Sequence, residues 1–330
     1  MQNHSVRTKY IRALGVTLTL LLSIGPVRPS SAQQTRDADL SSLARAIEKA
    51  RPSIVQIALV THHAPPTTRA VTFDPIERFA MGTGVLIGTK GYVVTALHVV
   101  TAGLAAVERR GDGSQRLEVA IPYRNVDDPA RVSARDCFAL VQFDEVDEDV
   151  VHDLALLKLK TNPFHAKIPA LARVNGVEFD NLQVSSATLD IARPPDGAGV
   201  AISGFPLGES SLVTTAGSLA SVWSSTQTES PVPLPSQDWS PPVQSDTYLA
   251  DLAANPGNSG GPIYLSKTGN LIGICVAIRL APMRDQNGNP VTVDGQQLSY
   301  ASGLTVVVPA RYIAELLDRN GVVWRDASKQ

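Results

Sequence analysis

The chain has 330 residues, of which 43% are hydrophobic and 18% charged, with two cysteines and a formal net charge of -2. This length and apolar content suffice for a large hydrophobic core and argue against a mainly disordered chain. A weakly acidic chain without a basic tract also argues against nucleic acid as its main partner.

The first 32 residues have the layout of a secretory signal peptide. Arg7, Lys9 and Arg12 form a positive start, an apolar run follows over residues 13–24, and small residues end the segment at Ala32. The alternative is a membrane anchor, but a spanning helix needs about 20 apolar residues. We therefore expect cleavage, no stable membrane insertion, and a periplasmic or secreted mature domain over residues 33–330.

The mature chain begins with one short helical pattern and then changes to strands. Apolar residues at helical spacing over 39–50 predict an amphipathic helix. Short β-rich runs separated by Gly, Pro, Asn and Asp follow, and a last helix is expected over 310–318. The expected strands are 54–60, 83–88, 92–97, 154–159, 200–205, 262–266, 271–278 and 304–309, and the expected surface loops are 107–131, 224–246 and 281–297. Many short strands without alternating long helices indicate an all-β barrel or sandwich.

The strongest functional signal is the octet NPGNSGGP at residues 255–262. A serine hydroxyl becomes a good nucleophile when a base accepts its proton, and two N–H groups must face the developing oxyanion. Glycines on both sides of Ser259 permit the required backbone conformations. The plainer alternative is a glycine-rich turn that holds an ordinary serine. We assign Ser259 as the candidate nucleophile and the N–H groups of Gly257 and Ser259 as the oxyanion hole.

The base should be a histidine held rigidly at the end of a strand. His98 directly follows the expected strand 92–97, whereas His62 and His63 lie in a polar stretch and His165 follows Asn-Pro-Phe at a predicted surface. A core histidine is the alternative for His98 taken alone. Beside the octet, His98 is the candidate general base.

The third group should be a buried carboxylate that orients the imidazole. Asp153 directly precedes the apolar run 154–159 and is the best candidate. Asp144, Asp147 and Asp149 belong to an acidic stretch that we interpret as a solvated connection. His152 is expected to point away and to take no part in the chemistry.

The order His98, Asp153, Ser259 is that of chymotrypsin-type enzymes. Four segments resemble the HtrA (Deg) branch of trypsin-like proteases: AIEKARPSIVQI, GTGVLIGTKGYVVTALHVV, HDLALLKL and DLAANPGNSGGPIYLSKTGNLIGICVAI. The resemblance implies two six-stranded antiparallel β-barrels, over about 53–165 and 180–309, with polypeptide substrates and no cofactor or metal. Unlike most of that branch, the chain shows no PDZ domain after the protease.

The resemblance also implies where the primary specificity pocket lies. Its floor is the residue six positions before the nucleophile, Ala253, and its wall is formed by Gly273, Ile274 and Cys275. Without an acid at the floor, a Lys or Arg side chain of the substrate would be left unpaired. Cleavage after small or medium apolar residues is therefore expected.

Two further alternatives remain open from the sequence. Cys137 and Cys275 could form a disulfide after export, although each lies in an apolar run and two separate buried thiols are the favoured interpretation. The protein is expected to be a serine endopeptidase that acts in extracytoplasmic protein quality control. The competing hypothesis is a catalytically latent binding or chaperone-like protein of the same fold.

Overall fold

The computed structural model describes residues 42–62, 76–122, 138–165, 182–209, 211–224 and 246–329. The chain divides into two compact units, Met1–Ala38 and Asp39–Gln330, and all described residues belong to the second. The expected signal segment, Cys137 and most of the expected loop 224–246 lie outside the described residues.

The first sheet has the strand order β5-β4-β1-β2-β3-β7-β6, and every neighbouring pair is antiparallel. Its two ends belong to one stretch of chain, because β5 and β6 are separated by Gln142 alone. β5 pairs with β4, and β6 pairs with β7, so this stretch closes a barrel of six segments. The strands are β1 (Ile54–His62), β2 (Ile76–Ile87), β3 (Tyr92–Ala96), β4 (Gln115–Pro122), β5 (Phe138–Val141), β6 (Phe143–Asp149) and β7 (Leu154–Leu159).

The second sheet closes in the same way. Its order is β12-β9-β10-β11-β16-β13-β8-β17, and an additional pairing of β12 with β13 joins six of these strands into a ring. Two short strands, β8 and β17, extend the sheet in parallel at β13. The strands are β8 (Thr188–Leu189), β9 (Gly199–Gly204), β10 (Val213–Ser224), β11 (Asp246–Asp251), β12 (Pro262–Leu265), β13 (Leu271–Pro282), β16 (Ser299–Pro309) and β17 (Arg325–Asp326). The all-β, two-barrel prediction is confirmed.

One hydrophobic core joins the two barrels. Val93 of β3 and Leu156 of β7 lie in the same buried cluster as Ile274 of β13 and Val308 of β16. Five of the six residues of β7 are buried, and Lys158 is the half-buried exception. Successive side chains of a strand point to opposite faces, so both faces of β7 are covered, which fits its almost wholly apolar sequence. Packing between the barrels therefore fixes the positions of the loops at their junction.

The helices differ from the prediction in one place. A helix spans 42–50, and α3 (Ala310–Arg319) buries Ile313 and Leu317, as expected. The expected loop 107–131 is wrong in its first part, because α2 (Leu97–Arg110) and β4 occupy much of it. α2 buries only Val99, Val100 and Gly103, so its apolar face is narrow. Its sequence therefore lacks a clear helical periodicity, and its start was assigned to the preceding strand. Short 3₁₀ turns complete the fold at η1 (Arg51–Ser53), η2 (Pro206–Gly208) and η3 (Ala327–Lys329).

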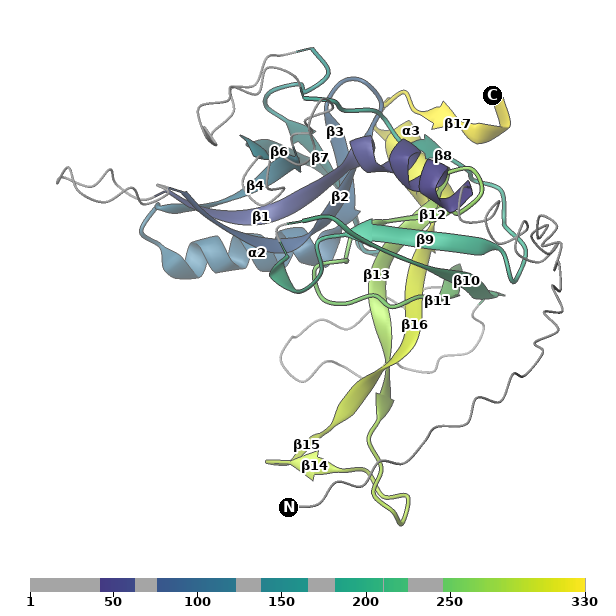
Figure 1. The fold of residues 1–330 in the computed structure, drawn as a ribbon. Coiled ribbons are helices and arrows are strands. Elements are labelled where there is room, and N and C mark those ends of the chain that lie inside the picture. Colours follow the sequence, from purple (N-terminus) through teal and green to yellow (C-terminus); the bar gives the residue numbers. More distant parts are fainter. Residues whose placement is uncertain are drawn as a thin grey trace, which may run out of the picture. The chain divides into compact units, whose positions relative to one another are not determined.

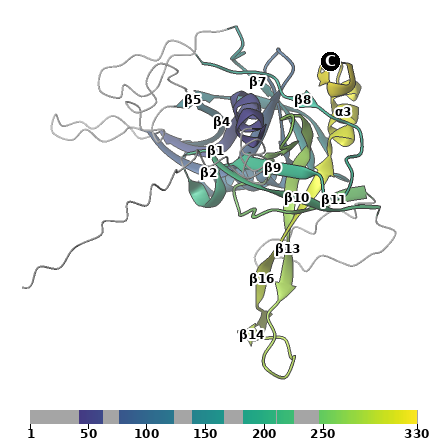
Figure 2. The ribbon, with the colours of Figure 1, turned by 45° about the vertical axis from the view of Figure 1, so that its right-hand side comes forward.

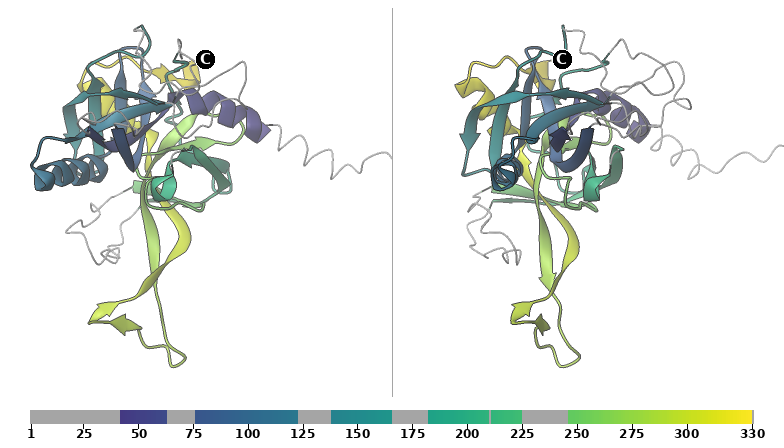
Figure 3. Two further views of the ribbon diagram at one scale, coloured as in Figure 1. Left: turned by 60° about the vertical axis from the view of Figure 1, so that its left-hand side comes forward. Right: turned by 90° about the vertical axis from the view of Figure 1, so that its left-hand side faces the viewer.

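A two-stranded arm extends from the second barrel (Figures 1 and 2). β13 and β16 continue past the barrel as a ribbon, and the small hairpin of β14 (Thr292–Val293) and β15 (Gln296–Gln297) lies at its end, as both views in Figure 3 show. The expected surface loop 281–297 forms this outer part. Its side chains are mostly exposed, including Met283 and Val293.

Candidate active site

His98 and Asp153 meet at one end of the first barrel. β3 ends at Ala96, and His98 is the second residue of α2 rather than the end of a strand. Nδ1 of His98 lies 2.6 Å from Oδ2 of Asp153, and the His98 backbone N–H donates to Oδ1 at 2.9 Å. The Asp153 side chain is 2% exposed and that of His98 19%. A buried carboxylate with two donors from one residue holds the ring in a fixed orientation, which leaves Nε2 as the proton acceptor.

The backbone of Asp153 is as constrained as its side chain. Its φ of 55° lies in the left-handed region, which non-glycine residues adopt infrequently. Its carbonyl accepts the N–H of Leu97 at 3.0 Å, so the turn before β7 is attached to the first turn of α2. Asp residues tolerate this conformation better than most because of their short polar side chain.

The loop that carries Ser259 is built from tight backbone hydrogen bonds. Asn258 N–H donates to the Asn255 carbonyl at 2.9 Å, and Gly261 N–H donates to the Asn258 carbonyl at 2.8 Å. Gly260 has a φ of 78° and donates to the Cys275 carbonyl of β13 at 2.7 Å. A Cβ at Gly260 would lie 2.2 Å from the Thr83 carbonyl oxygen, so this position requires glycine.

The same loop packs against the segment that carries His98. Thr83 N–H of β2 donates to the Ser259 carbonyl at 2.8 Å. A Cβ on Gly82 would lie 2.6 Å from a methyl group of Val99, the residue after His98, and 3.0 Å from the Ser259 carbonyl oxygen. The structure therefore brings the three predicted triad positions to one junction, although they come from both barrels.

The peptide planes on both sides of Gly257 are held in defined orientations. The Pro256 carbonyl accepts the Leu207 N–H at 2.6 Å, and the Gly257 carbonyl accepts the Thr83 hydroxyl at 2.7 Å. In a trans peptide the N–H points opposite to the preceding carbonyl, so the Gly257 N–H is turned away from Leu207. The Ser259 N–H is likewise turned away from Gly261. Among the described residues, neither the Gly257 N–H nor the Ser259 N–H donates a hydrogen bond.

The predicted pocket residues have different environments. Ala253 is exposed, whereas Gly273, Ile274 and Cys275 are buried. Gly273 packs closely on β16, where a Cβ would lie 2.2 Å from the Val308 carbonyl oxygen. Cys275 is a free thiol, and burial raises its pKa to about 12. The backbone of Cys275 contacts the Ser259 loop directly, through hydrogen bonds with Gly260 and Gly261.

The acidic stretch before Asp153 is strand β6 and not only a solvated connection. Oδ2 of Asp147 accepts hydrogen bonds from Arg319 at 2.8 Å and from Asn320 at 2.7 Å. These bonds, Asn320 first, hold the pKa of Asp147 below its usual value. Asp144 pairs with Lys160 at the surface. The partners of Asp147 lie at the end of α3, 172 and 173 residues away in sequence. The local sequence pattern around Asp147 does not reveal such distant partners.

His152 forms a second histidine–carboxylate pair beside the first. Its Nδ1 lies 2.7 Å from Oδ2 of Asp149, and its ring stacks on Tyr312 of α3 with centroids 3.6 Å apart. His165 is exposed, as expected. Neither this pair nor the contact of Thr83 with the Ser259 loop was predicted, because in the sequence Thr83 is an ordinary residue of an expected strand.

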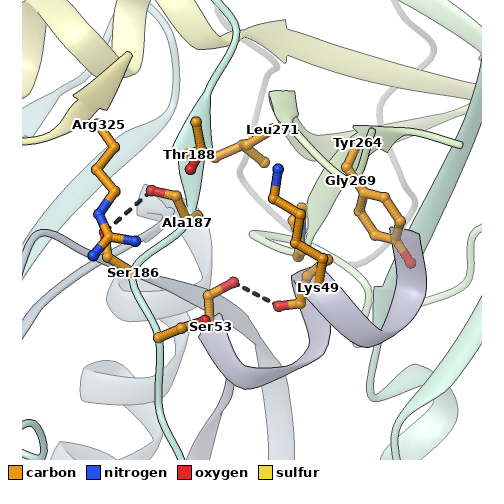
Figure 4. Close-up of a pocket in the computed structure, with 12 residues that line it drawn as sticks. Lys49, Ser53, Ser186, Ala187, Thr188, Tyr264, Gly269, Leu271 and Arg325 are labelled. Carbon is orange, nitrogen blue, oxygen red and sulfur yellow. Dashed lines mark hydrogen bonds between the residues drawn. The ribbon is translucent and has the colours of Figure 1, made fainter. Parts of the chain in front are cut away.

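The structure also has a cavity of about 160 Å³, whose lining residues are drawn in Figure 4. Helix 42–50, β8 and β12 contribute to its wall, and Ser53 in that wall donates to the Ala50 carbonyl at 2.7 Å. None of its lining residues belongs to the candidate triad or oxyanion hole. The described residues also contain no helix with the length and hydropathy needed to cross a membrane.

Comparison with known proteins gives a family. Residues 82–274 match the model of the trypsin-like peptidase domain. No curated protein sequence matches the chain significantly. The solved structure of an HtrA-type protease AlgW with a decapeptide is similar at 20% identity and a TM-score of 0.49, with 84% of this chain and 66% of that chain covered. A variant of that protease with a tripeptide gives 19% identity, a TM-score of 0.45 and coverages of 84% and 62%. The chain thus spans about two thirds of the length of these structures, or slightly less.

Proposed function

This chain belongs to the trypsin-like peptidase family and is a serine peptidase, and on that premise we propose that it is a catalytically competent endopeptidase with His98, Asp153 and Ser259 as its triad. The observation that carries this proposal is the His98–Asp153 pair. A buried carboxylate 2.6 Å from Nδ1 selects the tautomer whose Nε2 can accept the serine proton.

The reaction follows from these groups. Oγ of Ser259 attacks the carbonyl carbon of the scissile peptide bond while Nε2 of His98 takes its proton. The oxygen of the tetrahedral intermediate accepts hydrogen bonds from the N–H groups of Gly257 and Ser259. The carbon–nitrogen bond then breaks, and His98 gives its proton to the leaving amine. Water, deprotonated by His98, attacks the acyl-enzyme in the same way and releases the carboxylic acid product and Ser259.

The geometry of the loop favours competence over latency. A latent enzyme of this fold would lose its oxyanion hole if the Gly257 N–H were turned inward to another acceptor. Here Pro256 and Gly257 both have their carbonyl groups bound on the far side, at 2.6 Å and 2.7 Å. This arrangement supports an endopeptidase that is active without rearrangement of the loop.

Specificity and location form the finer part of the proposal. Ala253 at the expected pocket floor supplies no charge, so we expect cleavage after small or medium apolar residues. The segment 1–32 is expected to direct export to the periplasm or the exterior, where damaged or unfolded polypeptides would be the substrates. Peptide-library profiling tests the specificity: a dominant preference for Arg or Lys would refute the assignment of Ala253.

Labelling with a fluorophosphonate probe tests the central proposal. Wild-type protein should be labelled, because the probe reacts with a serine that an adjacent base activates. Ser259→Ala should abolish labelling and turnover, while Ser266→Ala, a serine on the β12–β13 turn, should change neither. Wild-type protein that is folded but resists labelling and cleaves no unfolded protein would instead be the latent scaffold.

A further inference from the structure

Thr83 uses all of its polar groups at the junction of the barrels. Its side chain and backbone are fully buried in β2. Its N–H donates to the Ser259 carbonyl at 2.8 Å, and its carbonyl accepts the Thr95 hydroxyl at 2.7 Å. Its own hydroxyl donates to the Gly257 carbonyl at 2.7 Å and accepts the Phe205 N–H at 3.2 Å. One residue of the first barrel therefore contacts the Ser259 loop at two points.

Thr83 can make these contacts because it lies just outside the paired part of β2 and β3. The pairing of β2 with β3 begins at Gly84 and Thr95, so the edge of β2 next to Thr83 is free to meet the second barrel. The partner is distant in sequence, since Thr83 and Gly257 are 174 residues apart. The contact forms only when both barrels are folded and packed.

Two restraints on Gly257 converge on this hydroxyl. The first is the direct bond to the Gly257 carbonyl, which fixes the peptide after Gly257. The second passes through the 205–207 segment: Thr83 holds Phe205, and Leu207 of the same segment holds the Pro256 carbonyl at 2.6 Å. Gly257 has a φ of 97° and no side chain, so its two peptide planes would otherwise rotate at little cost.

We propose that Thr83 is a positioning residue for the oxyanion hole: its hydroxyl keeps the Gly257 N–H facing the scissile carbonyl. This inference rests on the proposed function. It assigns to the first barrel a role in transition-state stabilisation in addition to carrying His98 and Asp153. The hydroxyl touches no reacting atom and acts only through the orientation of Gly257.

Packing alone would be retained by a valine at this position. Thr83 lies against two glycines. A Cβ added to Gly204 would lie 2.7 Å from the Thr83 hydroxyl oxygen, and one added to Gly261 would lie 3.4 Å from the Thr83 Cβ. Valine has nearly the same shape as threonine but leaves the Gly257 carbonyl and the Phe205 N–H without their partner. Serine keeps the hydroxyl and loses one methyl group. These two variants separate hydrogen bonding from packing.

The experiment compares Thr83→Val, Thr83→Ser and Thr95→Val in the full chain. Thr83→Val should lower kcat for a peptide substrate by roughly 10- to 100-fold, with KM changed less than about 3-fold, because one oxyanion donor is misplaced in the transition state. Inhibition by a peptide trifluoromethyl ketone, which forms an oxyanion on Ser259, should weaken by a similar factor. Thr83→Ser should recover most of kcat. Thr95→Val removes the neighbouring bond to the Thr83 carbonyl and should change kcat less than about 3-fold at a comparable loss of Tm.

The results distinguish this inference from the proposed function. Wild-type turnover with an unchanged kcat in folded Thr83→Val would overturn the role of Thr83 and leave the protease assignment intact. Equal loss of kcat in Thr83→Val and Thr95→Val would also overturn it, since the effect would then follow stability. If Thr83→Val does not fold, Thr83→Cys takes its place, because a thiol is a weak donor of similar size; a wild-type kcat in that variant overturns the inference as well. Wild-type protein without turnover or labelling would reject both proposals.

Discussion

The carboxylate of Asp153 binds His98 twice, through Oδ2 to the ring Nδ1 at 2.6 Å and through Oδ1 to the backbone N–H at 2.9 Å. Asp153→Asn keeps one acceptor for the backbone N–H but favours the wrong ring tautomer. We expect kcat to fall by up to about 10⁴-fold, the size known for chymotrypsin-type enzymes, with little change of Tm. Steady-state kinetics and thermal unfolding measure the two effects. A near-normal kcat in Asp153→Asn together with a large loss in Asp149→Asn would show that the wrong carboxylate was chosen.

The His152–Asp149 pair is expected to stabilise the fold and not to take part in the reaction. His152→Phe keeps the stacking on Tyr312 and the bond from the backbone N–H to Asp149, but removes the hydrogen bond between the ring Nδ1 and Asp149. The free energy of unfolding should fall by about 0.5–1.5 kcal/mol, while kcat stays within about 3-fold of wild type. Denaturant unfolding and peptide turnover check this expectation. Loss of activity as large as in His98→Ala would assign His152 a catalytic role.

Asp147 predicts a pH-dependent contribution to stability. Its bonds to Asn320 and Arg319 lower its folded-state pKa, so its stabilising effect is present above the usual Asp pKa of about 3.9 and disappears as pH falls through the lowered value. Asp147→Asn should therefore reduce stability at pH 7 by about 0.2–1 kcal/mol, as partly exposed pairs do. The difference from wild type should shrink below pH of about 4. Urea unfolding across this range measures it, and a difference that grows in acid would contradict the assignment.

Cys275 should be unreactive in the native protein. The thiolate is the reactive form, and a buried thiol with a pKa of about 12 forms almost none of it at pH 8. In a Cys137→Ser background, a disulfide reagent such as DTNB should label Cys275 very slowly in buffer and completely in guanidinium chloride. Rapid labelling of the folded protein would mean that β13 opens readily next to the Ser259 loop.

The arm beyond the second barrel should be dispensable for folding. Its outer part has mostly exposed side chains and adds nothing to the described hydrophobic clusters. Replacing residues 284–297 by Asn-Gly, a favourable two-residue hairpin turn, should change Tm by less than about 3 °C and leave turnover of a short peptide unchanged. Aggregation or a large fall of Tm on truncation would show that the arm supports the barrel.

Several features could be predicted because their signals are local. The apolar run at 154–159 predicts a buried strand from its own residues, and the structure has β7 over the same residues. Glycines around Ser259 permit a backbone that other residues would exclude. The helix α2 was missed because only one narrow side of it is buried, at Val99, Val100 and Gly103. Its periodicity is too weak to separate it from the end of a strand.

The sequence by itself determined that the chain forms many short strands, that it carries a serine in a glycine-rich loop, which histidine follows an apolar run and which carboxylate precedes one, because each of these depends on neighbouring residues. Only the tertiary structure decided that Asp153 and not Asp149 faces His98, and that a threonine 174 residues from Gly257 holds its carbonyl. The first contact forms when the first barrel closes and the second when the two barrels pack, and no pattern of neighbouring residues encodes either geometry. The assignment of catalytic roles to these residues rests on that packing.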